Sequence, residues 1–214
     1  MIKSTLILRD DGLPLCSSVD DDTDPALAEQ KKKIKVLMSR FTPSSAPEAT
    51  LESGAFEIHY VRVGAVVYFV IAEKGYPRNL AFSYLKEVAQ EFEHSYGHEY
   101  TRPTVRPYAF VTFDNFLQKT KKLYSDKRVQ DNLDQLNQEL MGVKQIMTKN
   151  IEDLLYRGDS LDKMSDLSAS LRQDSKKYRK SAQKINLDLL ISQYAPIAIV
   201  AFFLVFLIWW VFLK

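Results

Sequence analysis

The chain ends in nineteen consecutive residues without a charge, residues 195–213, and only Lys214 follows them. A helix of that length is about 28 Å long, close to the hydrocarbon thickness of a bilayer. Soluble cores seldom need so long an uninterrupted apolar helix, so we expect a single transmembrane helix here rather than a buried core helix. Such an anchor would insert after synthesis, with residues 1–194 on one side of the membrane.

The charges beside this segment predict its orientation. Positive charge concentrates on the cytosolic flank of membrane helices, and here it lies almost entirely before the span. We therefore expect a cytosolic N-terminus, a short juxtamembrane stretch at 189–194 and a tail-anchored topology. The basic residues can also meet anionic headgroups. They are Lys176, Lys177, Arg179, Lys180 and Lys184.

The rest of the composition excludes several protein classes. A net charge of +2 predicts no general affinity for nucleic acid. The single cysteine, Cys16, rules out an intramolecular disulfide, suits a reducing compartment and is interpreted as a small buried hydrophobe. The first residues lack the apolar stretch of a secretory signal peptide. These features agree with a cytosolic body.

Glycine and proline divide the chain into two regions. Twelve of the fifteen lie before residue 110, and only Gly142, Gly158 and Pro196 lie after it. A globular region interrupted by turns therefore precedes a long helical region.

The first region, residues 1–124, is predicted to be an α+β domain. Its order β-β-α-β-β-α-α gives a small antiparallel sheet covered by helices. Strands are expected at residues 2–8, 13–18, 56–60 and 66–72, the last being a central buried strand. Helices are expected from Pro25, from about Pro77 and around Phe113. Their apolar faces are Leu27, Ile34, Leu37, Met38 and Phe41; Ala81, Tyr84, Leu85, Val88 and Phe92; and Phe113, Phe116, Leu117 and Leu123.

After a linker at 125–128, residues 129–188 carry a heptad pattern with 3-4 spacing and no slip, which predicts one continuous helix about 80 Å long. A lone helix cannot bury such a seam, so we expect it to fold on meeting partner helices. The seam consists of Leu133, Leu136, Leu140, Val143, Met147, Asn150, Leu154, Arg157, Leu161, Met164, Ser168, Leu171, Ser175, Tyr178, Ala182 and Ile185.

Arg157 occupies the middle of this seam. Its guanidinium stays charged and offers five donors, so burying it without acceptors would cost several kcal/mol. The partner helices must therefore bring acceptors to this layer. One polar layer in an apolar seam also fixes the register of a bundle.

An arginine-centred seam that ends in basic residues and a C-terminal anchor resembles the R-SNAREs. Residues 150–159 (NIEDLLYRGD) are similar to that family's core, and residues 76–85 (YPRNLAFSYL) resemble the longin domain of Sec22-type R-SNAREs. The resemblance implies a profilin-like longin domain and a four-helix bundle in which three Q-SNARE helices each bring a glutamine to Arg157. It also implies membrane fusion between endoplasmic reticulum and Golgi, coat proteins as partners, and fold-back onto the longin domain through Asn150, Ile151 and Glu152.

Two other functions are compatible with parts of this sequence. A passive tail-anchored tether could use the same anchor and heptads, but a parallel pair would bring two Arg157 side chains together at one layer, which is repulsive. A tail-anchored enzyme would need convergent polar groups, and no glycine-rich phosphate loop or nucleophile motif is present. We therefore expect no enzymatic activity and no cofactor.

Metal binding was considered at two places. His94 and His98 are four residues apart and would share a helix face, but no third ligand accompanies them. The acidic residues that precede the first helix are interpreted as a solvated loop. We expect no metal site at either place. The acidic residues are Asp20, Asp21, Asp22 and Asp24.

Overall fold

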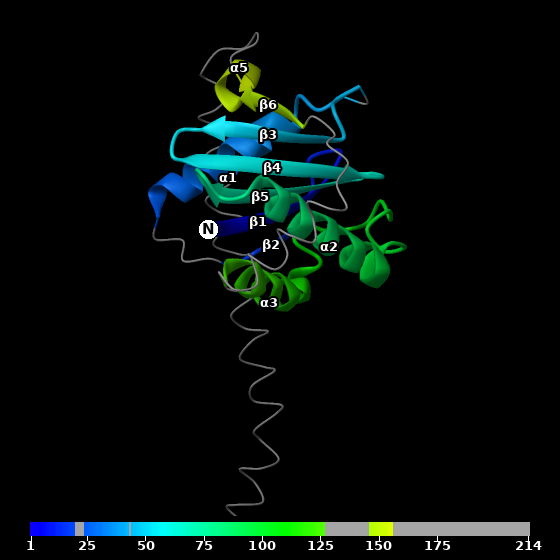
Figure 1. The fold of residues 1–214 in the computed structure, drawn as a ribbon. Coiled ribbons are helices and arrows are strands. Elements are labelled where there is room, and N and C mark those ends of the chain that lie inside the picture. The colour runs from blue at the N-terminus through cyan, green and yellow to red at the C-terminus, as the bar shows by residue number, and fades with distance from the viewer. Residues whose placement is uncertain (20–23, 43, 127–145, 156–214) are drawn as a thin grey trace, which may run out of the picture. The chain divides into compact units, whose positions relative to one another are not determined.

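The computed structural model describes residues 1–19, 24–42, 44–126 and 146–155 (Figure 1). The chain divides into two compact units, residues 1–174 and 175–214, and all described residues belong to the first. The predicted anchor, the basic residues before it, and Arg157 lie outside the described residues, as do all seam positions except Met147, Asn150 and Leu154. None of the helices in the described ranges is long and apolar enough to span a bilayer.

A mixed six-stranded sheet forms the centre of the domain, in the order β2-β1-β5-β4-β3-β6. The first five strands pair antiparallel with their neighbours, and β6 pairs parallel with β3. The strands are β1 (Ile2–Arg9), β2 (Pro14–Ser17), β3 (Glu48–Ser53), β4 (Phe56–Val63), β5 (Val66–Glu73) and β6 (Met147–Asn150).

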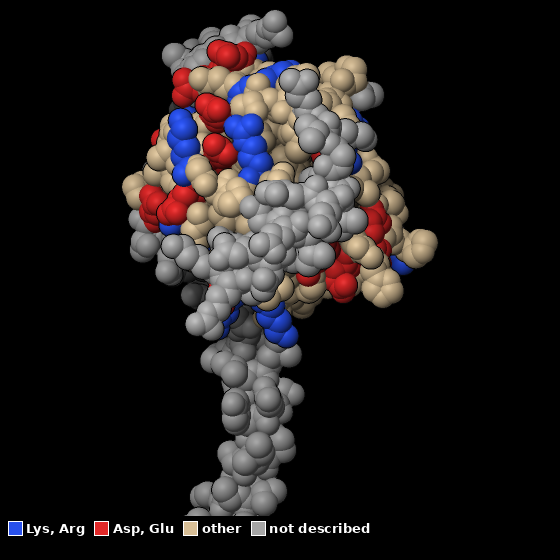
Figure 2. Space-filling view, viewed as in Figure 1, with Lys and Arg blue, Asp and Glu red and all other residues tan. Residues whose placement is uncertain are grey.

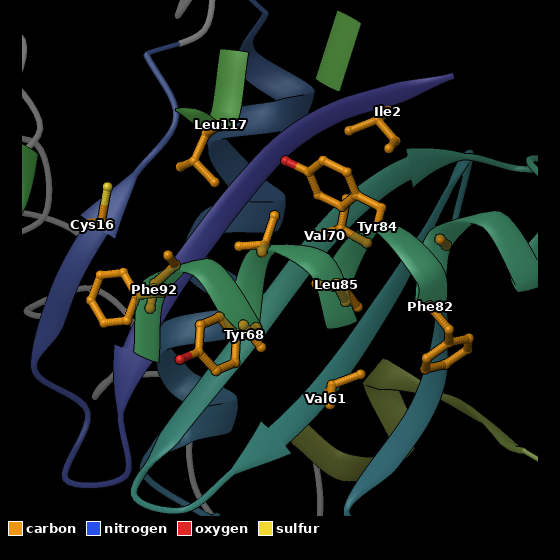
Figure 3. Packing of buried hydrophobic residues seen from close by; sticks show 14 of the residues in the cluster. Ile2, Cys16, Val61, Tyr68, Val70, Phe82, Tyr84, Leu85, Phe92 and Leu117 are labelled. Carbon is orange, nitrogen blue, oxygen red and sulfur yellow. The ribbon is translucent and has the colours of Figure 1, made fainter. Parts of the chain in front are cut away.

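Helices cover both faces of this sheet. The helices are α1 (Pro25–Met38), α2 (Arg78–Tyr96), α3 (Asp114–Ser125) and α5 (Ile151–Leu155), with a 3-10 turn, η1 (Val111–Phe113), before α3. Two apolar clusters result, one between the sheet and α2 with α3, the other between the sheet and α1 with α5. Figure 3 shows Tyr68, Val70, Tyr84, Leu85 and Phe92 in the first cluster.

The side chains of strand β5 contribute to an apolar core on each face of the sheet. Tyr68 and Val70 face the α2 side, and Phe69 and Ile71 face the α1 side, because side chains alternate along a strand. All four are fully buried. The prediction of a central buried strand at 66–72 is therefore confirmed.

The helix boundaries follow from capping. The Asp24 carboxylate accepts a hydrogen bond from the backbone N–H of Ala26 at 2.9 Å, and Pro25 takes the first turn, where a missing N–H costs little. Helix α2 ends at Tyr96, with Gly97 as its C-terminal cap. The start at Pro25 was predicted. In the β1–β2 turn, Gly12 has φ +85°, a conformation that favours glycine.

Three predictions about the first region were incomplete or wrong. Strand β3 was not predicted, so the observed order contains one more strand than β-β-α-β-β-α-α. The sheet is mixed rather than antiparallel, because β6 joins it. Leu123, placed on the apolar face of α3, is 47% exposed. Cys16 is 1% exposed and is not part of a disulfide, as predicted.

The helix over 129–188 was predicted for a chain bound to partner helices, and in this structure its described part, residues 147–155, has another form. Met147 and Asn150 belong to strand β6, and helix α5 begins at the next residue. The heptad pattern is a local signal, and an isolated helix gains little without a partner for its apolar seam. The free edge of β3 offers backbone hydrogen bonds instead, and the α1 side of the sheet offers an apolar surface.

Candidate functional site

Residues 146–155 bind along the edge of the sheet, beside β3 and α1, and we call them the docked segment. Figure 1 shows β6 and α5 next to β3, although about one hundred residues separate them in the sequence. The segment includes Asn150, Ile151 and Glu152, which the family resemblance had suggested for fold-back, and it is the candidate functional site within the described residues.

Backbone pairing fixes the position of the docked segment. Strand β6 runs parallel to β3, with Thr50 opposite Thr148 and Glu52 opposite Asn150. The Asn150 side chain then accepts a hydrogen bond from the backbone N–H of Glu152 at 2.9 Å. This is an N-cap interaction, and it explains why the strand changes into helix at Ile151.

Apolar burial holds the helical part of the segment. Ile151 is fully buried and Leu155 is 6% exposed, and both join the cluster beneath α1 that contains Ile34 and Leu51. Full burial of one such side chain contributes about 1.5–3 kcal/mol. The two seam residues of β6, Met147 and Asn150, are exposed. The segment therefore buries residues outside the predicted seam.

Three basic side chains contact the segment, two from α1 and the residues just after it and one from α2. Lys33 of α1 lies 3.5 Å from the Glu152 carboxylate. Arg40, just after α1, donates to the carbonyl oxygen of Leu154 at 3.0 Å. Arg78, the first residue of α2, donates to the Thr148 hydroxyl at 2.9 Å. The lysine pair is partly solvated and adds little, whereas the two arginine hydrogen bonds also fix the segment's position.

A cavity of about 120 Å³ lies between the docked segment, β3 and the end of α1. Its wall is mainly apolar, with Arg40 and Lys149 at its edge, and it is large enough for a small side chain. A space therefore remains between the docked segment and the domain. The lining residues are Leu37, Arg40, Phe41, Ser45, Ala46, Ala49, Leu51, Tyr60, Met147, Lys149 and Leu154.

A buried histidine lies one strand away from the edge that β6 covers. His59 of β4 is fully buried, and its Nδ1 shares a hydrogen bond of 2.9 Å with the Thr50 hydroxyl. Burial, together with the positive charge of Arg78, lowers the pKa of His59 from 6.5 to about 4. Its Nε2 is 3.7 Å from the Glu57 carboxylate, too far for a hydrogen bond. The imidazole is therefore neutral near pH 7.

This histidine gives the domain a defined pH dependence. The unfolded chain binds a proton at His59 below about pH 6.5, whereas the folded domain does not until about pH 4. Stability is therefore complete above pH 6.5 and falls as pH drops toward 4, by about 3 kcal/mol. Urea unfolding of the full chain in detergent, followed by near-ultraviolet circular dichroism of the buried tyrosines, would measure this loss.

His59→Gln is the matched control, because glutamine can keep the hydrogen bond to Thr50 without titrating. Carboxylates also titrate in this range, so the informative quantity is the difference between the two pH profiles. Parallel profiles for wild type and His59→Gln would contradict the assignment.

Comparison with known proteins identifies the architecture. Residues 15–117 match the longin family, a regulated-SNARE-like domain, and residues 132–212 match the synaptobrevin family. The protein transport protein SEC22 of Eremothecium gossypii is 80% identical over 210 residues, covering 98% of each chain. The chain belongs to the Sec22 family.

Other Sec22 relatives share its full length. SEC22 of Saccharomyces cerevisiae is 76% identical over all of both chains, and the 25.3 kDa vesicle transport protein SEC22-1 of Arabidopsis thaliana is 42% identical over 99% of this chain and 98% of its own. A chain in a homology model of the full-length AP-3 complex shows only a distant likeness, with 11% identity, a TM-score of 0.41 and coverage of 86% of this chain and 99% of that one. The family membership that residues 76–85 and 150–159 indicated is confirmed.

Sequence reasoning missed most of the residues that surround the docked segment. Lys33 and Arg40 lie in and just after α1 and Arg78 begins α2, and from the sequence each would be interpreted as a solvated surface charge. Only Arg78 lay within a quoted motif, residues 76–85. The described residues contain no group of three metal-ligating side chains. His94 and His98 both lie outside the core.

Proposed function

We propose that this Sec22-family chain is an R-SNARE, whose residues 129–188 contribute one helix to a four-helix bundle with three Q-SNARE helices. Assembly from the Leu133 end toward Ile185 would draw a vesicle and its target membrane together in transport between endoplasmic reticulum and Golgi. The observation that carries the proposal is the synaptobrevin match over 132–212, which includes the whole predicted seam and Arg157. The transport names of full-length relatives support it.

The chemistry of the central layer follows from Arg157. Its guanidinium would lie inside the bundle, where three glutamine amide oxygens satisfy its donors. Leucine and methionine layers on both sides would exclude water from this layer. A shift of one layer would leave the charge unpaired, so the arginine would select the correct register.

The remaining parts would hold and regulate this helix. Residues 195–213 would anchor the chain, and the basic residues at 176–184 would keep the body on the cytosolic side. The longin domain would regulate assembly through the docked segment, because Met147 and Asn150 cannot belong to β6 and to a bundle helix at once. Coat proteins would be able to select the docked form as a sign of an unassembled chain.

A pull-down tests the bundle. The full chain, solubilised from membranes in detergent, is compared with Leu161→Asp, and the bound chains are identified by mass spectrometry. We expect three Q-SNARE helices with the wild type and at least a hundredfold less with the variant, because an unpaired carboxylate would enter the apolar seam. Lys163→Asp is the matched control, since that position faces away from the seam.

The same experiment separates fusion from passive tethering. Recovery of the chain only with itself would favour the tether and leave Arg157 without its role. Arg157→Gln should be milder than Leu161→Asp, because an amide still hydrogen-bonds within a polar layer. Loss of assembly with Arg157→Gln as complete as with Leu161→Asp would argue against glutamine acceptors.

A further inference from the structure

Five lysines gather at one end of the longin domain, where β1 begins, β5 ends and α3 finishes. We call this region the basic end. Figure 2 shows Lys and Arg side chains at the lower edge of the domain, where Figure 1 places α3. The five are Lys3, Lys74, Lys119, Lys121 and Lys122.

Direct contacts join these elements into one surface. The Lys121 ammonium donates to the carbonyl oxygen of Lys3 at 2.6 Å, which ties α3 to β1. Lys3 in turn lies 2.7 Å from the Glu73 carboxylate at the end of β5, next to Lys74. The Tyr76 hydroxyl donates to the carbonyl oxygen of Tyr124 at 2.9 Å, which ties the turn after β5 to the end of α3.

Positive charge is in excess on this surface. Its carboxylates include Glu73, which pairs with Lys3, Glu87, which accepts a hydrogen bond from Tyr124, and Asp126, and those of Glu52 and Glu57 lie within 4.0 Å of the Arg78 guanidinium. Lys119 and Lys122 are exposed and form no ion pair with any residue in the described ranges. They are three residues apart on α3 and therefore project from the same side of the helix.

Exposed apolar side chains lie among these lysines. Met1 is 54% exposed and Leu123 is 47% exposed, and they are two of the four large hydrophobic residues that are exposed among the described residues. Leu123 follows Lys122 and lies one turn after Lys119, so the helix presents both kinds of side chain together. Cations mixed with exposed apolar side chains are the combination that binds the surface of an anionic membrane.

We propose that the basic end binds the anionic headgroups of the membrane in which the chain itself is anchored. This inference rests on the proposed anchor at 195–213, which would keep the domain within reach of one bilayer and raise the effective lipid concentration. The charges are spread over three elements and form a broad surface, which fits a headgroup layer better than a single peptide. Lys119 and Lys122 would contact headgroups, and Leu123 would enter the interface.

The test uses the full chain in lipid nanodiscs of phosphatidylcholine alone or with 30% phosphatidylserine. An environment-sensitive fluorophore is attached at Leu123→Cys, and a second preparation carries it at Val63→Cys. Val63 pairs with Val66 at the opposite end of the sheet from Glu73 and is also exposed. Cys16 is buried and does not compete for the label. Spin-labelled lipid headgroups report proximity by quenching.

We expect quenching at position 123 in phosphatidylserine discs only, and little quenching at position 63. The quenching at position 123 should be lost in 0.5 M salt, because salt screens exposed charges. Lys119→Glu with Lys122→Glu should lower the ratio of bound to free domain about tenfold or more. Arg102→Glu with Arg106→Glu is the matched control. It changes the charge equally at the far end of β1, where Arg9 donates to the Arg102 carbonyl oxygen at 3.3 Å.

Two results would overturn the inference. Absence of quenching at position 123 in discs that contain the chain would do so, and would leave the basic end to an acidic protein partner. An equal fall in the ratio of bound to free domain with both double variants would show an effect of net charge rather than of this surface. Failure of the chain to enter the discs would instead contradict the proposed anchor, and the two failures are distinguished by whether protein and lipid purify together.

Discussion

Replacing Ile151 with aspartate is expected to release the docked segment from the longin domain. Ile151 is fully buried in the apolar cluster beneath α1, so the variant loses about 1.5–3 kcal/mol of burial and adds the cost of an unpaired carboxylate. The docked fraction should fall by a factor of a hundred or more. Hydrogen exchange of the full chain, read by mass spectrometry, should show loss of protection in β6 and in β3.

Met147→Asp is the matched control for this release. It introduces the same charge on the same segment, but Met147 is already 49% exposed, so the effect should be much smaller. Retention of full protection in the Ile151→Asp variant would contradict the role of this side chain. In the proposed function the released variant should also assemble faster with Q-SNARE helices, because Met147 and Asn150 would no longer be held in a strand.

Phe92→Ala is expected to cause the largest loss of stability in the longin domain. Phe92 is fully buried on α2, and its ring packs edge-to-face against Tyr68, Phe110 and Phe113. Truncating it removes the contacts of a whole ring and leaves a cavity, which typically costs about 3–5 kcal/mol. Urea unfolding of the full chain, followed by near-ultraviolet circular dichroism, would measure the change.

Phe116→Ala separates this effect from a general loss of aromatic contacts. Phe116 stacks on Phe113 at 5.2 Å between ring centroids, but it is only partly buried at the edge of the same cluster. Its loss should cost less than half as much. Equal losses for the two variants would contradict the central position assigned to Phe92.

Local periodicity predicted those helices and strands whose pattern of buried residues is visible in their own sequence. Strand β5 is apolar throughout because both of its faces are covered, and α2 presents its core residues at helical spacing. Pro25, Gly12 and Gly97 marked boundaries through backbone chemistry that needs no partner. These features were therefore predictable from the sequence.

Strand β3 was missed because its burial depends on its neighbours. Only Ala49 and Leu51 are apolar, and Thr50 and Ser53 are buried polar residues. Thr50 is acceptable there because His59 of β4 hydrogen-bonds to its side chain. Such a segment becomes recognisable as a strand only when strands lie on both sides of it.

The docked segment shows the same limit more sharply. Its heptad spacing predicts a helix when partner helices are present, yet in this structure Met147–Asn150 is a strand beside β3. Ile151 and Leu155 do not lie on the seam, so the heptad pattern assigned them no function. Lys33, Arg40 and Arg78 come together at the segment only in the folded domain. Their spacing along the chain does not predict these contacts.

The parallel pairing of β6 with β3 also protects the sheet from other chains. Without β6, the strand Glu48–Ser53 would be the last in the sheet, and its outward N–H and C=O groups would be open to any extended peptide. Glu48 and Glu52 would repel some intruding strands but not block them. Each time the docked segment leaves the domain, the edge of β3 would be unpaired. In the proposed function, the chain would therefore be prone to aggregation until the segment binds partner helices.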